Sequence, residues 1–486
     1  MEQSSHSPVI MWFRQDLRLE DNPALSDASS RGNLIPIYIL DDVNAMQDRM
    51  GAASRFWLHY ALDSLNRSLE GQLRLFCGDA STIVPKIMEM SGARSIFWNR
   101  CYEPWRIARD TKLKCVLMEA GIEVHSNNGS LLWEPWTIKK KDGSAYKVFT
   151  PFYTKGCLNS ETPRPPLPPI GNTSYAANDL GGKTLDDLGL LPRVNWHKSM
   201  KTRWEISEKA ASEQLYNFMQ SRLDGYMERR NFPADAGVSR LSPYLHFGQI
   251  SPQRVWQSVG SLVRQKNGDN NADIDHFLRE LGWREFSYYL LYHFPDLPNR
   301  NLQERFNEFP WVKVSSELEA WQRGLTGYPL IDAGMRELWQ TGYMHNRVRM
   351  VAASFLVKNL LVHWKCGADW FWDCLVDADL ASNSASWQWV AGSGADAAPF
   401  FRIFNPITQS EKFDAEGKYI LTYVPELQNL PKKYLHAPWL APKTVLDAEG
   451  INLGVDYPNP IVDIKSSRTR ALCAFQEHRA RSAISQ

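Results

Sequence analysis

The first part of the chain alternates short apolar runs with longer segments of helical periodicity. Runs of strand length lie at residues 9–13, 34–40, 73–77, 95–99 and 122–125. Helical patterns lie between them, most clearly at residues 53–69 and 108–120. Strands that alternate with helices indicate βαβ units. The pattern therefore predicts a doubly wound α/β domain with a parallel sheet over residues 1–130.

A proline-rich stretch follows this part of the chain. Residues 160–174 read SETPRPPLPPIGNTS, and proline lacks the backbone N–H that helices and central strands need. From residue 205 the pattern changes, and helical patterns cover residues 205–221, 251–263, 274–292, 333–341, 344–361 and 368–375. We therefore predict an interdomain linker over residues 131–204 and an all-helical domain over residues 205–486. Its last segment, residues 466–486, is expected to be a helix or a frayed tail.

Composition narrows the classes of protein that fit. The 55 Lys and Arg residues almost balance the 54 Asp and Glu residues, so a polyanion can be bound only by a local basic patch. The seven cysteines form no C-x-x-C pair and no zinc spacing, which predicts reduced thiols in a cytoplasmic protein without a metal site. No signal-peptide pattern and no uncharged apolar run of about 18 residues occurs, so no membrane association is expected. The 19 tryptophans suit a core and also suit stacking on flavins or bases.

Two clusters in the helical part carry candidate chemistry. Residues 238–242, VSRLS, lead into a helix start with two hydroxyls and an arginine; this arrangement suits a phosphate, or it is an ordinary helix cap. Glu280, Trp283 and Arg284 share one helix face, which is either an ion pair or the wall of a binding site. No G-x-G-x-x-G follows the first strand, and no G-x-x-x-x-G-K-[ST] occurs. A conventional dinucleotide or nucleoside triphosphate site is therefore not supported.

Two more clusters follow along the chain. Residues 344–350, MHNRVRM, open a helix with basic and amide side chains, which suit an anion or form a solvated charge cluster. Residues 377–383, DADLASN, precede Trp387 and Trp389. Two positions on a helix point about 200° apart when one residue separates them. One indole can therefore face the interior while the other lines a cleft, although both can also be core residues.

Several of these blocks, together with others, carry a resemblance to a known family. The blocks are MWFRQDLRLEDNPAL, VSRLSPYL, WREF, MHNRVRM, DADLASN, ASWQWVAGSGADAAPFFRIFNP and EKFD. In their order and spacing the chain resembles the DNA photolyase/cryptochrome family over almost its whole length, and within it the bacterial cyclobutane pyrimidine dimer photolyases. The resemblance implies an N-terminal antenna domain and a helical domain that binds FAD. It also implies light-driven repair, in which photo-excited reduced FAD passes an electron to a dimer flipped out of UV-damaged DNA.

The resemblance assigns roles residue by residue. The implied FAD contacts are Tyr226, Val238, Ser239, Arg240, Leu241, Ser242, Arg349, Asp377, Asp379 and Asn383. The implied electron relay to the flavin consists of Trp387, Trp364 and Trp311. The implied contacts to the dimer are Glu280, Trp283, Asn346, Met350 and Trp389. The implied contacts to DNA phosphates are Arg230, Arg347 and Arg402.

Differences between subfamilies favour one lesion. Plant cryptochromes tend to carry Asp and Tyr where this chain has Asn383 and Trp389. Photolyases of (6-4) lesions have histidines at the positions of Asn346 and Met350, and a histidine supplies the proton that (6-4) repair needs. The resemblance therefore implies repair of cyclobutane dimers. A cryptochrome-like blue-light receptor that binds FAD is the alternative, and a (6-4) photolyase is a weaker one.

The antenna chromophore is the least determined feature. One folate-binding pattern of the family has Asn-Glu where this chain has Trp105 and Arg106. Residues 51–59 resemble the branch near plant cryptochromes, which implies 5,10-methenyltetrahydrofolate, with 8-hydroxy-5-deazaflavin or no antenna as alternatives. The family also implies a cytoplasmic monomer without an obligate protein partner.

Overall fold

The computed structural model of the protein describes residues 7–171, 173–177, 180–265, 271–312, 316–400 and 402–484. The chain forms two compact units, each made of several segments. Unit 1 comprises Met1–Asp224, Ser239–Pro295 and Val376–Ala381. Unit 2 comprises Gly225–Val238, Asp296–Leu375 and Ser382–Gln486. The sheet and the first long helices of the helical region thus belong to unit 1, and the domain boundaries predicted from the sequence stay predictions.

Unit 1 contains a five-stranded parallel sheet in the order β3-β2-β1-β4-β5. The strands are β1 (Pro8–Phe13), β2 (Asn33–Leu40), β3 (Arg74–Cys77), β4 (Ser95–Asn99) and β5 (Glu123–Asn127). They confirm the five predicted runs within one or two residues. The central strands β1, β2 and β4 are buried almost throughout, because helices cover both faces of such a sheet.

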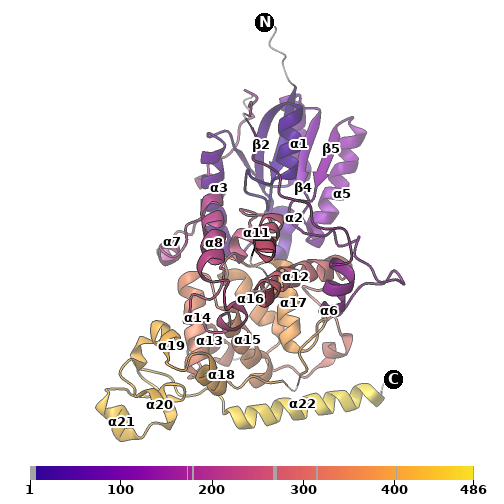
Figure 1. Ribbon diagram of the computed structural model, residues 1–486. Coiled ribbons are helices and arrows are strands. Elements are labelled where there is room, and N and C mark those ends of the chain that lie inside the picture. Colours follow the sequence, from indigo (N-terminus) through magenta and orange to yellow (C-terminus); the bar gives the residue numbers. More distant parts are fainter. Residues whose placement is uncertain are drawn as a thin grey trace. The chain divides into compact units, whose positions relative to one another are not determined.

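Helices connect the strands of the sheet (Figure 1). They are α1 (Pro23–Arg31), α2 (Asp42–Ala45), α3 (Ala52–Ser68), α4 (Ala80–Ser91) and α5 (Pro104–Glu119). Alternate residues of the strands, such as Ile10 and Trp12, form one core with α4 and α5, whereas α1 contacts β1, β2, β4 and β5. Side chains of successive strand residues point to opposite faces, so this arrangement confirms the predicted α/β fold.

The predicted linker is hydrogen-bonded to the sheet. Residues 160–171 form neither helix nor strand, as their prolines predict. Beyond them, the Leu34 N–H donates to the Ser174 carbonyl, and the Lys183 N–H donates to the Leu75 carbonyl. The segment therefore supplies partners for backbone groups of β2 and β3 that the sheet itself leaves open.

The remaining helices of unit 1 confirm the helical periodicity after residue 205. Ahead of them lie α6 (Phe149–Pro151), the π-helical turn η2 (Phe152–Cys157) and α7 (Lys198–Lys201). The later helices are α8 (Glu208–Ser221), α10 (Ser242–His246), α11 (Pro252–Gln265) and α12 (Asn271–His293). The Ser207 side chain accepts from the N–H of Ala210 and so begins α8 with a conventional cap.

Unit 2 is helical. Its main helices are α9 (Tyr226–Arg229), α13 (Ser316–Arg323), α14 (Pro329–Thr341), α15 (Asn346–Ser354), α16 (Trp364–Cys374), α18 (Pro406–Phe413), α19 (Lys418–Tyr423), α20 (Lys432–Leu435), α21 (Lys443–Ala448) and α22 (Ile464–Ile484). Helix α17 (Leu380–Ala391) begins in unit 1 and continues in unit 2. The predicted tail is thus a helix as far as the described residues reach, and residues 485 and 486 lie outside them.

One predicted helix differs in detail from its pattern. The periodicity over residues 344–361 predicts a single helix, but α15 ends at Ser354 and continues as the π-helical turn η6 (Phe355–Asn359). A π-helical turn inserts an extra residue and redirects the side chains that follow. Lys358 and Asn359 are buried there. No helix in the described part of the chain is both long and apolar enough to span a bilayer.

Candidate functional site

The start of α10 links two parts of the predicted FAD set in unit 1. Ser242 is the first residue of this helix, and its Oγ donates to Oδ2 of Asp377 over 2.6 Å. Arg240, just before the helix, has a φ of 53°, which non-glycine residues rarely adopt. Strained backbone of this kind is concentrated at binding sites, where the surroundings hold it. The loop and the carboxylate are therefore held together before any ligand binds.

Asp379 is a buried carboxylate with three polar neighbours. The Tyr288 hydroxyl donates to its Oδ2, and Nδ1 of His246 lies 3.6 Å from the same oxygen. Burial by itself disfavours the charged form, but His246, Arg284 and Tyr288 outweigh burial and hold the pKa of Asp379 well below its ordinary value. Asp379 is therefore a negatively charged hydrogen-bond acceptor at neutral pH.

In unit 2, Arg349 and Asn383 are held by backbone carbonyls. Nε of Arg349 donates to the Met344 carbonyl over 2.7 Å, and Nδ2 of Asn383 donates to the Ala368 carbonyl over 3.0 Å. Because a carbonyl oxygen only accepts, the second bond fixes which end of the amide faces Ala368. Oδ1 of Asn383 is thereby turned away from this carbonyl and can accept a hydrogen bond from a ligand.

Four other predicted FAD contacts lie between residues 226 and 241, where the chain passes from unit 2 to unit 1. Tyr226 and Leu241 are buried, and Val238 and Ser239 are half-buried. Tyr226 and Val238 belong to unit 2, whereas Ser239 and Leu241 belong to unit 1. The residues of the predicted FAD set thus belong partly to unit 1 and partly to unit 2.

Helix α16 positions two of the predicted relay tryptophans: Trp387 packs against it, and Trp364 is its first residue. Trp387 is 2% exposed, and a Cβ at Gly367 would lie 2.1 Å from its ring, so only glycine allows this close approach. Trp364, one turn earlier, donates its Nε1–H to Oδ1 of Asn301 over 2.8 Å. The same helix therefore positions both indoles.

The third tryptophan, Trp311, is joined to Trp364 through a histidine ring. The His363 centroid lies 5.3 Å from that of Trp311 and 5.4 Å from that of Trp364. Nδ1 of His363 accepts from the Lys365 N–H and caps α16. Desolvation and the charge of Lys365 lower the pKa of His363, although Asp369 opposes the shift. The ring between the two indoles is therefore neutral at neutral pH.

Three arginines of unit 2 form a local concentration of positive charge. Partial burial, Arg230 and Arg402 lower the pKa of Arg347, because each like charge disfavours the next. Aromatic rings lie against two of them, with the Arg347 guanidinium 4.4 Å from the Phe413 ring and the Arg230 guanidinium 5.5 Å from the Tyr226 ring. A bound phosphate would relieve this repulsion.

The predicted lesion contacts come from both units. In unit 1, Glu280 and Trp283 are half-buried on α12, whereas their neighbour Arg284 pairs with Glu285 at 3.1 Å. In unit 2, Asn346 is exposed and Met350 is half-buried on α15. Trp389 is half-buried as well, in contrast to the buried Trp387, so the structure favours the first of the two arrangements that their spacing allows.

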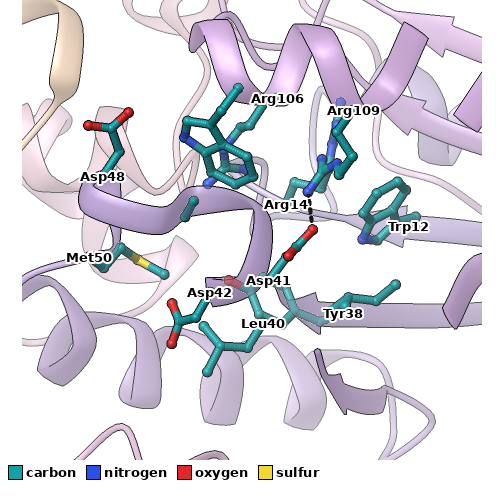
Figure 2. A pocket seen from close by; sticks show the side chains of 13 residues that line it. Trp12, Arg14, Tyr38, Leu40, Asp41, Asp42, Asp48, Met50, Arg106 and Arg109 are labelled. Atoms are coloured by element: carbon teal, nitrogen blue, oxygen red, sulfur yellow. Dashed lines mark hydrogen bonds and ion pairs between the residues drawn. The ribbon is translucent and has the colours of Figure 1, made fainter. Parts of the chain in front are cut away.

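A pocket lies at the carboxyl ends of β1 and β2 (Figure 2). Parallel sheets of this type bind ligands at that edge. Its wall includes Trp12, Arg14, Tyr38, Asp41, Trp105, Arg106 and Arg109. The Arg109 guanidinium lies 4.9 Å from the Trp12 ring and 5.2 Å from the Trp105 ring, and its Nη1 pairs with Asp41 at 3.0 Å. The cavity of about 30 Å³ holds only a few waters, so a larger ligand requires a side chain to move.

Two buried donors in this pocket have no hydrogen-bond partner within the described residues. They are Nε1 of Trp12 and Nε of Arg14, whereas Nε of Arg106 lies 3.4 Å from a carboxylate oxygen of Glu103. Buried donors are normally satisfied. Trp105 lies at the start of α5 and is only half-buried, so it is one of the wall residues that can swing outward. The pocket therefore offers donors and aromatic faces to a ligand that carries acceptor atoms.

Sequence reasoning missed the groups that orient the predicted residues. Tyr288, His246 and Asn301 carry no motif of their own, because tertiary packing alone brings them to Asp379 and Trp364. For the pocket a signal was present, since Trp12 and Arg14 stand at the carboxyl end of the first predicted strand. That is the edge where doubly wound sheets bind ligands.

Comparisons with known proteins identify the family of the chain. Residues 9–169 match the family model described as DNA photolyase, and residues 277–477 match the one described as FAD binding domain of DNA photolyase. The chain belongs to the DNA photolyase family.

Among its relatives, the "Deoxyribodipyrimidine photo-lyase" of Agrobacterium fabrum is 46% identical over 474 residues, which cover 96% of this chain and 98% of that protein. "Cryptochrome-2" of Arabidopsis thaliana is 39% identical over 95% of this chain and 77% of its own length. The crystal structure of a bacterial class III photolyase from Agrobacterium tumefaciens superimposes with a TM-score of 0.94 at 45% identity, covering 99% of this chain and 100% of that one.

Proposed function

We propose that the protein is a deoxyribodipyrimidine photo-lyase, which uses light to repair cyclobutane pyrimidine dimers in DNA. The observation that carries this proposal is the 46% identity, over nearly the full length of both chains, to a bacterial protein of that name. The residues that separate the subfamilies support it, because this chain has Asn383, Trp389, Asn346 and Met350 at the informative positions. In the cell we expect a cytoplasmic monomer that acts on UV-damaged DNA.

The described side chains fit FAD in both units. Around the start of α10, the backbone N–H groups of residues 239–242 suit phosphate oxygens, and Ser242 holds the Asp377 carboxylate beside them. The charged Asp379 suits hydroxyl or ring N–H donors. In unit 2, Arg349 and the open Oδ1 of Asn383 suit the polar edge of an isoalloxazine ring. An uncharged amide there adds a hydrogen bond without adding negative charge, which favours a reduced flavin that is itself anionic.

When bound and excited by light, reduced FAD would supply one electron to the dimer. The two bonds that join the pyrimidines would then break, and the electron would return to the flavin. The residues of the chain bind and orient the substrate for this transfer. Trp283 and Trp389 stack on the flipped bases, and Asn346 and Glu280 bond their polar edges. The relay Trp387, Trp364 and Trp311 brings electrons inward to restore the reduced flavin.

The sheet-edge pocket is our proposed antenna site. A pterin ring of 5,10-methenyltetrahydrofolate would stack on Trp12 or Trp105 once the Trp105 side chain swings outward. Its ring oxygen and carboxylates would accept from Nε1 of Trp12 and Nε of Arg14, which have no hydrogen-bond partner among the described residues. A deazaflavin offers similar acceptors, and the chromophore extracted from the purified protein distinguishes the two.

Repair of a defined lesion tests the proposal. The photoreduced protein is illuminated with DNA that carries a single thymine cyclobutane dimer, and the thymine absorbance is followed. Recovery in the light and none in the dark is the expected result. The Trp389→Ala variant should bind the dimer poorly while it keeps FAD, because the base–aromatic stacking it removes is worth about 1–3 kcal/mol.

A blue-light receptor is the second candidate, favoured by the 39% identity to a plant cryptochrome. Under that function, fully reduced protein would leave the thymine dimer unrepaired, and Trp389→Ala would change little. The same assay with a (6-4) lesion tests the third candidate, a (6-4) photolyase. Recovery on that lesion alone would show that the lesion assignment is wrong.

A further inference from the structure

An aromatic stack lies behind Trp283 in unit 1. Phe149 and Trp283 lie face to face, with ring centroids 3.8 Å apart and planes inclined by 11°. Tyr153 stacks on Phe149 with centroids 5.6 Å apart and planes inclined by 15°. The Arg279 guanidinium lies 5.5 Å from the Phe149 centroid and 5.7 Å from the Tyr153 centroid. Phe149 is thus the middle ring of the stack, between Trp283 and Tyr153.

The backbone of α12 is shaped for this stack. Gly282 precedes Trp283, and a Cβ on it would lie 2.6 Å from Cδ2 of Tyr153 and 2.7 Å from its Cε2. Real Cβ atoms do not approach a ring so closely, so glycine is what allows Tyr153 to reach the helix. The ring of Phe149 is then held between Tyr153 and Trp283.

Exposure differs sharply along the stack. Phe149 is 2% exposed, whereas Trp283 is half-buried. One face of the indole is therefore covered by Phe149, and the indole still has accessible surface. A buried ring behind a partly open ring is a fixed platform on which a further planar group can stack.

We infer that Phe149 is the positioning residue for Trp283 in lesion recognition, an inference that rests on the proposed function. By covering one face of the indole, it fixes the ring plane and leaves the other face for a flipped-out pyrimidine. An aromatic side chain that is already ordered loses little conformational entropy when a base stacks on it. Undamaged duplex does not present an extrahelical base, so this arrangement favours damaged over undamaged DNA.

The test compares two phenylalanines of the same aromatic cluster. Phe149→Leu removes the stacked face and keeps an apolar side chain of similar volume. Phe152→Leu is the matched control, because Phe152 is also 2% exposed and packs on Phe286 and Tyr289, with centroids 5.0 Å and 4.8 Å away. The structure shows no ring contact between Phe152 and Trp283 in the described part of the chain.

Binding is measured to one oligonucleotide with and without a single thymine cyclobutane dimer. For Phe149→Leu we expect affinity for the damaged strand to fall roughly three- to tenfold, as the loss of an aromatic stack predicts. Affinity for undamaged DNA should stay unchanged. Phe149→Tyr and Phe152→Leu should both keep the preference for damaged DNA. A merely structural role of the cluster does not explain this difference from Phe149→Leu. Equal preferences in Phe149→Leu and Phe152→Leu would overturn the inference.

Trp283→Ala separates this inference from the proposed function. If Trp283→Ala keeps the full preference for the dimer, the proposed lesion site itself is wrong. If it loses the preference while Phe149→Leu keeps it, only the role of Phe149 is wrong. FAD absorbance and melting temperature verify that each variant folds. If Phe149→Leu does not fold, Gly282→Ala is the second test, because its Cβ would displace Tyr153 and so disturb the stack from the other side of Phe149. An unchanged preference for damaged DNA in Gly282→Ala counts against the inference.

Discussion

Lys358 is a buried amine whose titration tests the electrostatics of unit 2. Its side chain is 1% exposed in η6, and its Nζ donates to the Arg402 carbonyl over 3.0 Å. Desolvation and, to a smaller extent, the positive charge of Arg402 lower the pKa of Lys358 from 10.5 to about 7. In the unfolded chain the same amine titrates near its ordinary value. Folding therefore releases a proton from Lys358 at every pH between these two values.

The sign and size of the effect follow from this difference. Between the two pKa values the unfolded chain binds more protons, so the free energy of unfolding rises with pH by about 1.4 kcal/mol per pH unit. From about pH 7.5 to about pH 9 the contribution of Lys358 is about 2 kcal/mol. Lys358→Met abolishes this dependence. The variant also leaves the Arg402 carbonyl without its donor, which costs about 1–3 kcal/mol at every pH.

Urea unfolding at both pH values, followed by circular dichroism, measures the effect. We expect wild type to gain about 2 kcal/mol relative to Lys358→Met as the pH rises. Lys365→Met is the control, because Lys365 is a partly exposed lysine that pairs with Asp369 at 2.8 Å. Its unfolding free energy should run parallel to that of wild type. If wild type and Lys358→Met also run parallel, Lys358 keeps its proton in the folded state and the reasoning fails.

Three further predictions concern the flavin and the DNA. Gly367→Ala places a Cβ 2.1 Å from the Trp387 ring. It should destabilise the protein by about 1–3 kcal/mol and slow photoreduction of the flavin. An unchanged rate of flavin bleaching would contradict the role of this packing. Ser242→Ala removes the donor to Asp377 and should weaken retention of FAD by about 1.5–3 kcal/mol, measured as flavin lost on dialysis, whereas undiminished retention would refute it. Arg347→Gln should weaken binding of damaged and undamaged DNA alike and reduce the slope of log affinity against log salt by about 1; a changed lesion preference would count against a phosphate contact.

Local patterns predicted most of the elements because their physical cause is local. Strand β1 is buried on both faces and so appears as an unbroken apolar run, which needs no alternation to be recognised. The spacing of Trp387 and Trp389 predicted that the two indoles point in different directions, since a helix repeats every 3.6 residues, and it left open whether both are buried. The turn η6 was not predictable in this way. Lys358 is buried within this turn, and the apolar pattern of residues 344–361 does not distinguish the turn from a regular helix.

What the sequence determined by itself is the class of each segment and, through its motif blocks, the family and the residues to examine. Those features depend on near neighbours in the chain, whose spacing is visible in the letters. Only the tertiary structure decided that Phe149 lies flat against Trp283 and that Asn383 turns its amide nitrogen to Ala368. It also decided that Nε1 of Trp12 and Nε of Arg14 have no hydrogen-bond partner in the described part of the chain. Such contacts join residues far apart in sequence, and their geometry depends on how whole elements pack, which no local pattern encodes.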